Sequence, residues 1–214
     1  MKPFNPYQRE HNLHWTVLQM RTLLGNALKL KSSTYISYAA LEARMIIERV
    51  EFEILVMAAH ESLNTDWQEL IEKQNGIQKV NSKYKALRFR YQSFTEAFSK
   101  VILIDSPIKP FEFKKAEEFQ SKLSQYIHIY TRKPEELLFE SEFMKAGIKL
   151  IEATISFLEN MFTIQDNNYV FGVLNFSSLK NGFEIEFNNW LKTLDEDVEA
   201  LTKRLHKIAS NFKP

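Results

Sequence analysis

The sequence contains no cysteine, which excludes disulfide scaffolds, thiolate metal sites and cysteine nucleophiles. Glycine is scarce, with only five residues in 214, whereas phenylalanine and tyrosine occur 17 and eight times. Because glycine favours turns and aromatic rings fill cores, this balance is typical of long helices with aromatic packing and less typical of a loop-rich enzyme. A hydrophobic content of 44% is ample for a real core.

Positive and negative charges are nearly balanced in the chain. With 28 basic and 27 acidic residues the net charge is +1, which excludes an overall electrostatic attraction to nucleic acid or to an anionic membrane. Any such partner must be met by a local patch. No apolar stretch approaches the roughly 18 residues of a membrane span, and the first residues lack the apolar run of a signal peptide. We therefore expect a cytoplasmic protein with no membrane partner.

Sequence motifs of well-known catalytic and metal sites are also absent. The chain has no glycine-rich phosphate-binding loop, no Gly-x-Ser-x-Gly and no His-Glu-x-x-His. A di-metal carboxylate bundle needs Glu-x-x-His pairs on partner helices, and the chain has none. We expect no metal and no cofactor, and the missing motifs count against an enzyme.

Residues 34 to 60 contain no proline or glycine and predict one long central helix. Arg44 and Glu48 are four residues apart on this helix, which predicts an ion pair. The helix has two apolar faces, one made of Ala39, Ala43, Ile46, Val50, Ile54 and Met57 and the other of Tyr38, Leu41, Met45, Phe52, Val56 and Ala59. Because a surface helix shows one apolar stripe, two faces predict packing partners on both sides.

Apolar residues recur at helical spacing along most of the remaining chain. The predicted helices cover about 9–30, 65–75, 84–104, 116–133, 134–162 and 191–208. The last of them keeps a heptad spacing. We therefore predict an all-α bundle of about six helices in a single domain over residues 1 to 214, with the proline-containing loop 105–110 as the only candidate boundary.

Residues 166 to 187 have a different pattern. Asn181-Gly182 is a hairpin turn signal, and Phe183, Ile185 and Phe187 alternate with glutamates as in a strand. The residues before this turn that favour a strand are Tyr169, Val170, Phe171, Val173 and Phe176. A small β-hairpin is therefore predicted just before the C-terminal helix.

A basic segment precedes the middle of the chain. Lys83, Lys85, Arg88 and Arg90 are interleaved with the aromatic residues Tyr84, Phe89 and Tyr91. Basic residues bind phosphates and exposed aromatic rings stack on unpaired bases, so this segment is a candidate nucleic-acid site. The alternative is that the basic residues only solvate the outer face of a helix.

His128 is the other candidate for chemistry. It follows Lys122 and precedes Arg132, and fixed cations favour the neutral imidazole. A neutral imidazole could act as general base towards a ribose hydroxyl while the cations hold phosphate. We therefore add Arg132 to the candidate nucleic-acid ligands. The alternative is a hydrogen-bonded histidine at the boundary of a helix.

Two runs of the sequence resemble a known superfamily. YAALEARMIIERVEFEIL, residues 38–55, is followed in a second predicted helix by LSQYIH, residues 123–128. With the order of the helices, they resemble the HEPN superfamily of helical bundles found in prokaryotic RNA-targeting, toxin and phage-defence systems. The resemblance covers about residues 10 to 165, and residues 166–214 are a local extension.

The resemblance implies roles for two residues. Catalytic members of the superfamily cut RNA without metal, using an Arg that is followed, after four to six residues, by a His, and they pair two such motifs across a dimer. Here His128 matches the histidine, and Lys122 stands where the arginine is expected. Lys does not reproduce the bidentate fork of Arg, so the motif is degenerate.

These observations lead to three functional hypotheses. The first is a non-catalytic HEPN-like module that binds RNA or a protein partner as a homodimer, in a defence or toxin-related setting, with Lys122, His128, Arg132 and segment 83–90 facing a common groove. The second is a metal-independent endoribonuclease that uses His128 and Lys122. The third is a scaffold that associates through the apolar seam of residues 191–208, which requires that seam to be exposed.

Overall fold

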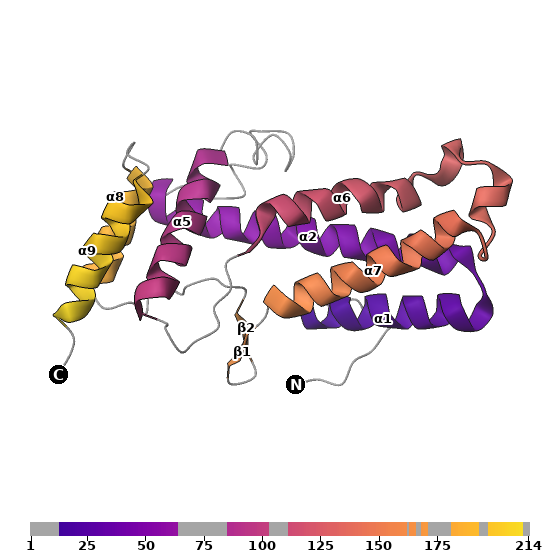
Figure 1. Cartoon of the computed structure of the whole chain (residues 1–214), viewed down its shortest axis with the longest axis horizontal. Coiled ribbons are helices and arrows are strands. Elements are labelled where there is room, and N and C mark those ends of the chain that lie inside the picture. Colours follow the sequence, from indigo (N-terminus) through magenta and orange to yellow (C-terminus); the bar gives the residue numbers. More distant parts are fainter. Residues whose placement is uncertain are drawn as a thin grey trace. The chain divides into compact units, whose positions relative to one another are not determined.

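The computed structural model describes residues 13–63, 85–102, 111–161, 163–165, 168–170, 181–192 and 197–211. These residues form seven α-helices, two short 3-10 helices and one pair of strands (Figure 1). The elements are α1 (Leu13–Leu30), α2 (Ser33–Leu63), α5 (Lys85–Ile102), α6 (Phe113–Ile127), η1 (Ile129–Thr131), η2 (Pro134–Leu137), α7 (Glu142–Met161), β1 (Thr163–Gln165), β2 (Asn168–Val170), α8 (Asn181–Lys192) and α9 (Val198–Ser210). The predicted all-helical class is confirmed. None of the described helices is both long and apolar enough to span a membrane.

The chain divides into two compact units. One contains Met1–Val50 and Glu112–Asn160, and the other contains Glu51–Phe111 and Met161–Pro214. One division falls inside α2, and another follows the segment 105–110 that the sequence marks as a break. That segment and the predicted helix 65–75 lie outside the described residues. The single domain over residues 1 to 214 stays a prediction.

The first unit is formed by α1, the part of α2 up to Val50, α6 and α7, which lie side by side (Figure 1). The first predicted face of α2 is buried throughout its described part, at Ala39, Ala43, Ile46, Val50 and Ile54. Gly147 of α7 marks the closest approach, because a Cβ atom there would lie 2.6 Å from the Tyr126 ring of α6 and 3.2 Å from Ile36 of α2. A glycine at this position lets three helices meet.

Polar side chains join the same helices. Arg44 donates to Glu48 at 2.8 Å, as its spacing predicts, and its guanidinium also donates to Ser124 of α6 at 2.9 Å. Arg21 of α1 makes a bidentate pair with Glu159 of α7, at 2.7 and 2.8 Å. These contacts fix the register of the helices more than they add stability, since exposed ion pairs contribute little.

The second predicted face of α2 is largely exposed in the first unit. Tyr38, Leu41 and Met45 have exposed fractions of 53%, 39% and 41%, and their spacing of three and four residues places them in one row, here called the α2 stripe. The prediction of packing partners on both sides is therefore wrong for this part of the helix. Here α2 behaves as a surface helix, which buries a single stripe.

The second unit has an aromatic core between α5 and α8. The ring of Phe94 lies 4.9 Å from that of Phe187, and the ring of Phe98 lies 5.2 Å from that of Phe183, both edge to face. Trp190 donates from Nε1 to the Arg90 carbonyl at 2.9 Å. Leu201 and Leu205 of α9 are fully buried.

The predicted hairpin with its turn at Asn181-Gly182 is wrong, because these two residues open α8. Phe183 and Phe187 are four residues apart and share the buried face of this helix, whereas Ile185 has an exposed fraction of 61%. The alternation of apolar and acidic residues resembles that of a strand, but only the two phenylalanines of this run face the core. The pair of strands in the structure occurs earlier, where β1 pairs antiparallel with β2 and Ile164 faces Tyr169 in the register. Strand β2 contains Tyr169 and Val170, two of the residues that favour a strand in the sequence.

The predicted last helix is also divided. Leu191 belongs to α8, and α9 begins only at Val198, where Asp197 caps it by accepting from the backbone N–H groups of Glu199 and Ala200 at 2.9 and 3.0 Å. The described leucines of the heptad seam, Leu191, Leu201 and Leu205, are buried within their own unit. This seam is therefore not a free surface for association.

Candidate functional site

The candidate site begins where α6 ends. His128 is the residue after the last helical turn, with φ −98° and ψ 62°, and its N–H donates to the Ser124 carbonyl at 3.0 Å. The chain then forms η1 and takes an extended conformation at Arg132 and Lys133. The predicted helix up to residue 133 is therefore too long. The extended backbone at Lys133 is expected before a proline, because Pro134 disfavours helical geometry there.

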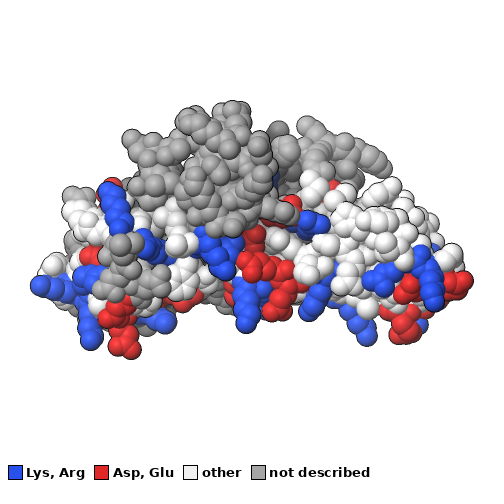
Figure 2. Space-filling view, turned by 90° about the horizontal axis from the view of Figure 1, so that it is seen from above, with Lys and Arg blue, Asp and Glu red and all other residues white. Residues whose placement is uncertain are grey.

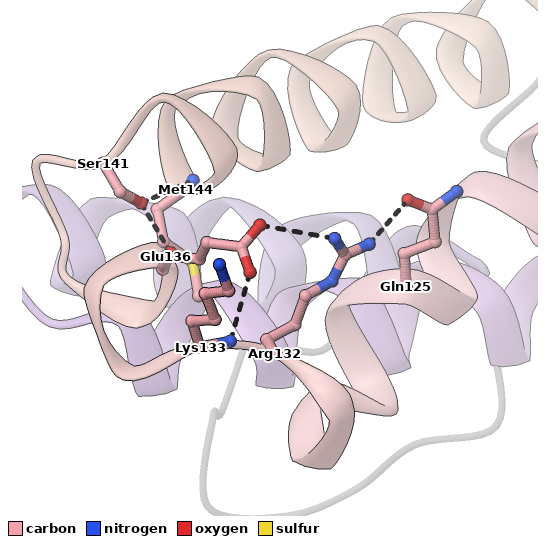
Figure 3. Close-up of polar contacts among 6 residues, drawn as sticks. All are labelled: Gln125, Arg132, Lys133, Glu136, Ser141 and Met144. Carbon is pink, nitrogen blue, oxygen red and sulfur yellow. Dashed lines mark hydrogen bonds and ion pairs between the residues drawn. The ribbon is translucent and has the colours of Figure 1, made fainter.

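Arg132 organises this turn (Figure 3). Its guanidinium donates to the side chain of Gln125 at 3.2 Å and approaches the carboxylate of Glu136 at 3.5 Å. The same group lies 4.4 Å from the centroid of the Phe143 ring, in cation–π geometry. The other oxygen of Glu136 accepts from the Lys133 N–H at 3.1 Å. Arg132, predicted as a nucleic-acid ligand, is thus engaged on several sides by its own fold.

Ser141 connects the turn to the start of α7 (Figure 3). Its hydroxyl donates to the Glu136 carbonyl at 2.6 Å and accepts from the Met144 N–H at 3.2 Å. Acceptance from the third residue along is the geometry of an N-cap, so α7 begins at Glu142 and not at Pro134 as predicted. Ser141, directly before Glu142, is a helix-start signal in the sequence. Pro134 was the predicted start instead because proline is also common in the first turn of a helix.

Lys122, near the end of α6, is exposed, and so are His128, Tyr130 and Lys133 of the turn that follows. Tyr130, predicted on the apolar face of a helix, instead has an exposed fraction of 84%. The His128 ring lies edge-on to it, with centroids 6.2 Å apart. We call these four residues the α6 corner. The candidate catalytic pair, Lys122 and His128, therefore lies at the surface.

Several acidic residues lie near the corner in the sequence: Glu135 is exposed, and three others are paired. Glu136 is held by Arg132, Glu140 lies 3.8 Å from Lys31, and Glu142 accepts from Lys145 at 2.9 Å. The hydrogen bond and charge of Lys145 lower the pKa of Glu142 and, in return, raise the pKa of Lys145. The ammonium groups of Lys122 and Lys133 have no ion-pair partner among the described residues.

Tyr126 lies beneath the corner. Its ring stacks on that of Phe143, with centroids 4.4 Å apart and planes 16° apart. Burial raises the pKa of Tyr126, and the positive charge of Arg132 partly opposes that rise. The neutral phenol is therefore the form that the fold favours.

Among the described residues of the basic segment, only Lys85 is an exposed cation. Lys85 is exposed, but Arg88 is buried, and Arg90 donates to the Leu191 carbonyl at 3.0 Å. Lys83 lies outside the described residues. Lys85, Arg88 and Arg90 belong to the second unit, whereas Lys122, His128 and Arg132 belong to the first. A common groove for the two groups stays a prediction.

Positive charge does not gather into one large patch on the face shown in Figure 2. Over the described residues of that face, blue Lys and Arg side chains are interspersed with red Asp and Glu side chains. Any contact with phosphate there would therefore involve a few cations at a time. No group of three or more His, Cys, Asp or Glu residues in the described part of the chain is arranged to hold a metal ion.

Comparison with known proteins identifies no relative. No model of a protein family matches the chain, and no curated protein or solved structure matches it. The HEPN resemblance therefore rests on the residues that suggested it.

Proposed function

We propose that this chain is a HEPN-like, cytoplasmic module that binds RNA at the α6 corner without cleaving it, in a defence or toxin-related setting. The observation that carries the proposal is the position of Lys122 and Lys133, two exposed cations without an ion-pair partner among the described residues. Lys122 lies about one helical turn before Gln125, and Lys133 directly follows Arg132. The hydrogen bond from Arg132 to Gln125 therefore connects the parts of the chain that carry the two lysines. Compact ammonium groups of this kind are suited to phosphate oxygens.

The geometry of His128 favours binding over cleavage. An effective general base needs a partner that orients its ring, and the His128 ring has no hydrogen bond to another described residue. Lys122 supplies charge but not the fork of an arginine. The endoribonuclease alternative predicts that RNA is cut and that His128→Ala abolishes cutting, with two copies of His128 close together in a dimer.

Binding of a fluorescent single-stranded RNA oligonucleotide at low salt tests the proposal. The variant Lys122→Gln with Lys133→Gln is expected to bind about tenfold more weakly, because two phosphate contacts are lost. Lys114→Gln with Lys149→Gln removes the same charge from exposed positions on α6 and α7 and should bind like the unmodified protein. An unmodified protein that does not bind RNA would sink the proposal.

A second candidate function is association with a protein partner, which the α2 stripe favours. Tyr and Met are enriched at protein interfaces, and the stripe adds Leu41 to them as one continuous exposed apolar row. We take the partner to be a second copy of the chain, in keeping with the homodimer that the HEPN resemblance implies. Light scattering should then give the mass of a dimer for the unmodified protein and of a monomer for Leu41→Lys. The control Ile185→Lys changes an exposed residue of α8 and should leave the mass unchanged.

A further inference from the structure

We infer that Tyr130, supported by His128, is a stacking platform for an unpaired base, so that the α6 corner selects single-stranded RNA. This inference rests on the proposed function and specifies its ligand. Among the described residues no other large apolar or aromatic side chain is as exposed as Tyr130, at 84% against 63% for Leu138 and 61% for Ile185. Packing of the fold does not require a ring at this position.

The turn holds Tyr130 between two fixed backbone positions. On one side the His128 N–H donates to the Ser124 carbonyl, and on the other the Arg132 N–H donates to the Ile129 carbonyl, both at 3.0 Å. The contacts of Arg132 with Gln125 and Glu136 then fix the end of the turn. A ring on an ordered turn loses little conformational freedom when a base stacks on it.

His128 limits where that base can lie. Its ring meets Tyr130 edge to face, at an interplanar angle of 71°, so it flanks the tyrosine without covering it in a parallel stack. A base that stacks on Tyr130 would thus have the imidazole beside it as a hydrogen-bonding neighbour. Lys122 and Lys133 supply charge for the adjoining phosphates.

This arrangement distinguishes single-stranded from duplex RNA. Bases in a duplex are already stacked on their neighbours and cannot place a face on a protein ring, whereas unpaired bases can. Stacking is tolerant of sequence because every base has a π face, so we expect no strong preference among bases.

The test compares three variants on a single-stranded oligonucleotide, on the same oligonucleotide with abasic sites, and on a duplex. Tyr130→Ala should weaken binding to the single strand about tenfold, as expected for a lost stacking contact. Tyr130→Trp should keep the affinity and show quenching of the added indole fluorescence when RNA binds. Leu138→Ala removes a neighbouring exposed apolar side chain and should have no effect.

The abasic oligonucleotide should bind the unmodified protein about as weakly as the intact single strand binds Tyr130→Ala. Equal affinity of Tyr130→Ala and the unmodified protein, with the Lys122 and Lys133 variant still impaired, would overturn the stacking role and leave RNA binding in place. Equal affinity for duplex and single strand would also overturn it. Absence of all RNA binding would remove both this inference and the proposed function.

Discussion

Arg132 lies over the ring of Phe143, with its guanidinium carbon 4.4 Å from the ring centroid. Tyr126 stacks on the same ring, also at 4.4 Å between centroids, so Phe143 contacts both a cation and a phenol. The three residues come from the turn after α6, from α7 and from α6. This stack therefore explains how a segment with only short 3-10 helices keeps a defined shape at the end of the first unit.

Arg132→Ala should destabilise the protein by about 1–2 kcal/mol, because it removes a cation–π contact and the contacts of the guanidinium with Gln125 and Glu136. Arg132→Lys should recover part of this loss, since it keeps the charge but not the planar fork. Chemical denaturation measures both. Lys133→Ala serves as the control and should stay within about 0.5 kcal/mol. A loss for Lys133→Ala equal to that for Arg132→Ala would argue against the stack.

The pH dependence of stability should carry a signature of Tyr126. Its native pKa is raised above the ordinary value of 10.0, so the fold favours the neutral form. The corresponding stability is fully present below the ordinary pKa and is lost as pH rises through the native pKa. Tyr126→Phe cannot ionise, so its free energy of unfolding should fall less than that of the unmodified protein between pH 8 and about pH 11. Parallel curves for the two proteins would contradict this assignment.

Much of the helical framework could be predicted from the sequence. The central helix follows from a long run without proline or glycine, and the Arg44–Glu48 pair follows from its spacing. What spacing could not show is which apolar face of α2 is buried, because that depends on helices far away in the chain. The α2 stripe was therefore predicted to be buried and is exposed.

Gly147→Ala should be destabilising, by about 1–3 kcal/mol, because the new methyl group would lie 2.6 Å from the Tyr126 ring and force the three helices apart. Gly25 is the matched control, since it is also a helical glycine but has open space around its Cβ position. Gly25→Ala should stabilise the protein by about 0.5–1 kcal/mol through helix propensity. Thermal or chemical unfolding of the two variants should thus move in opposite directions.

Phe187→Ala should cost about 3–5 kcal/mol, because the ring is fully buried against Tyr91 and Phe94. Ile185→Ala should cost little, since its side chain points to solvent on α8. A strand with the alternation that the sequence suggested would instead place both residues on one face and make both changes costly. Denaturation of the two variants therefore distinguishes helix from hairpin at residues 183–187.

The candidate site was less predictable than the framework. The sequence predicts Lys122, His128 and Arg132 as candidate site residues, but it places them on one regular helix that continues to Pro134. The end of α6 at Ile127 turns Tyr130 outward and commits Arg132 to Gln125 and Glu136. These outcomes depend on individual side-chain contacts, including that of Arg132 with the Phe143 ring of α7, which no local periodicity encodes.

The most direct test of RNA binding at the α6 corner is the salt dependence of the association constant for single-stranded RNA. Each phosphate contact adds about −0.7 to the slope of log K against log salt concentration, so removing Lys122 and Lys133 together should make the slope shallower by about 1.4. The Lys114 and Lys149 variant should keep the slope of the unmodified protein. Equal slopes for all three proteins, or no binding at low salt, would contradict the account.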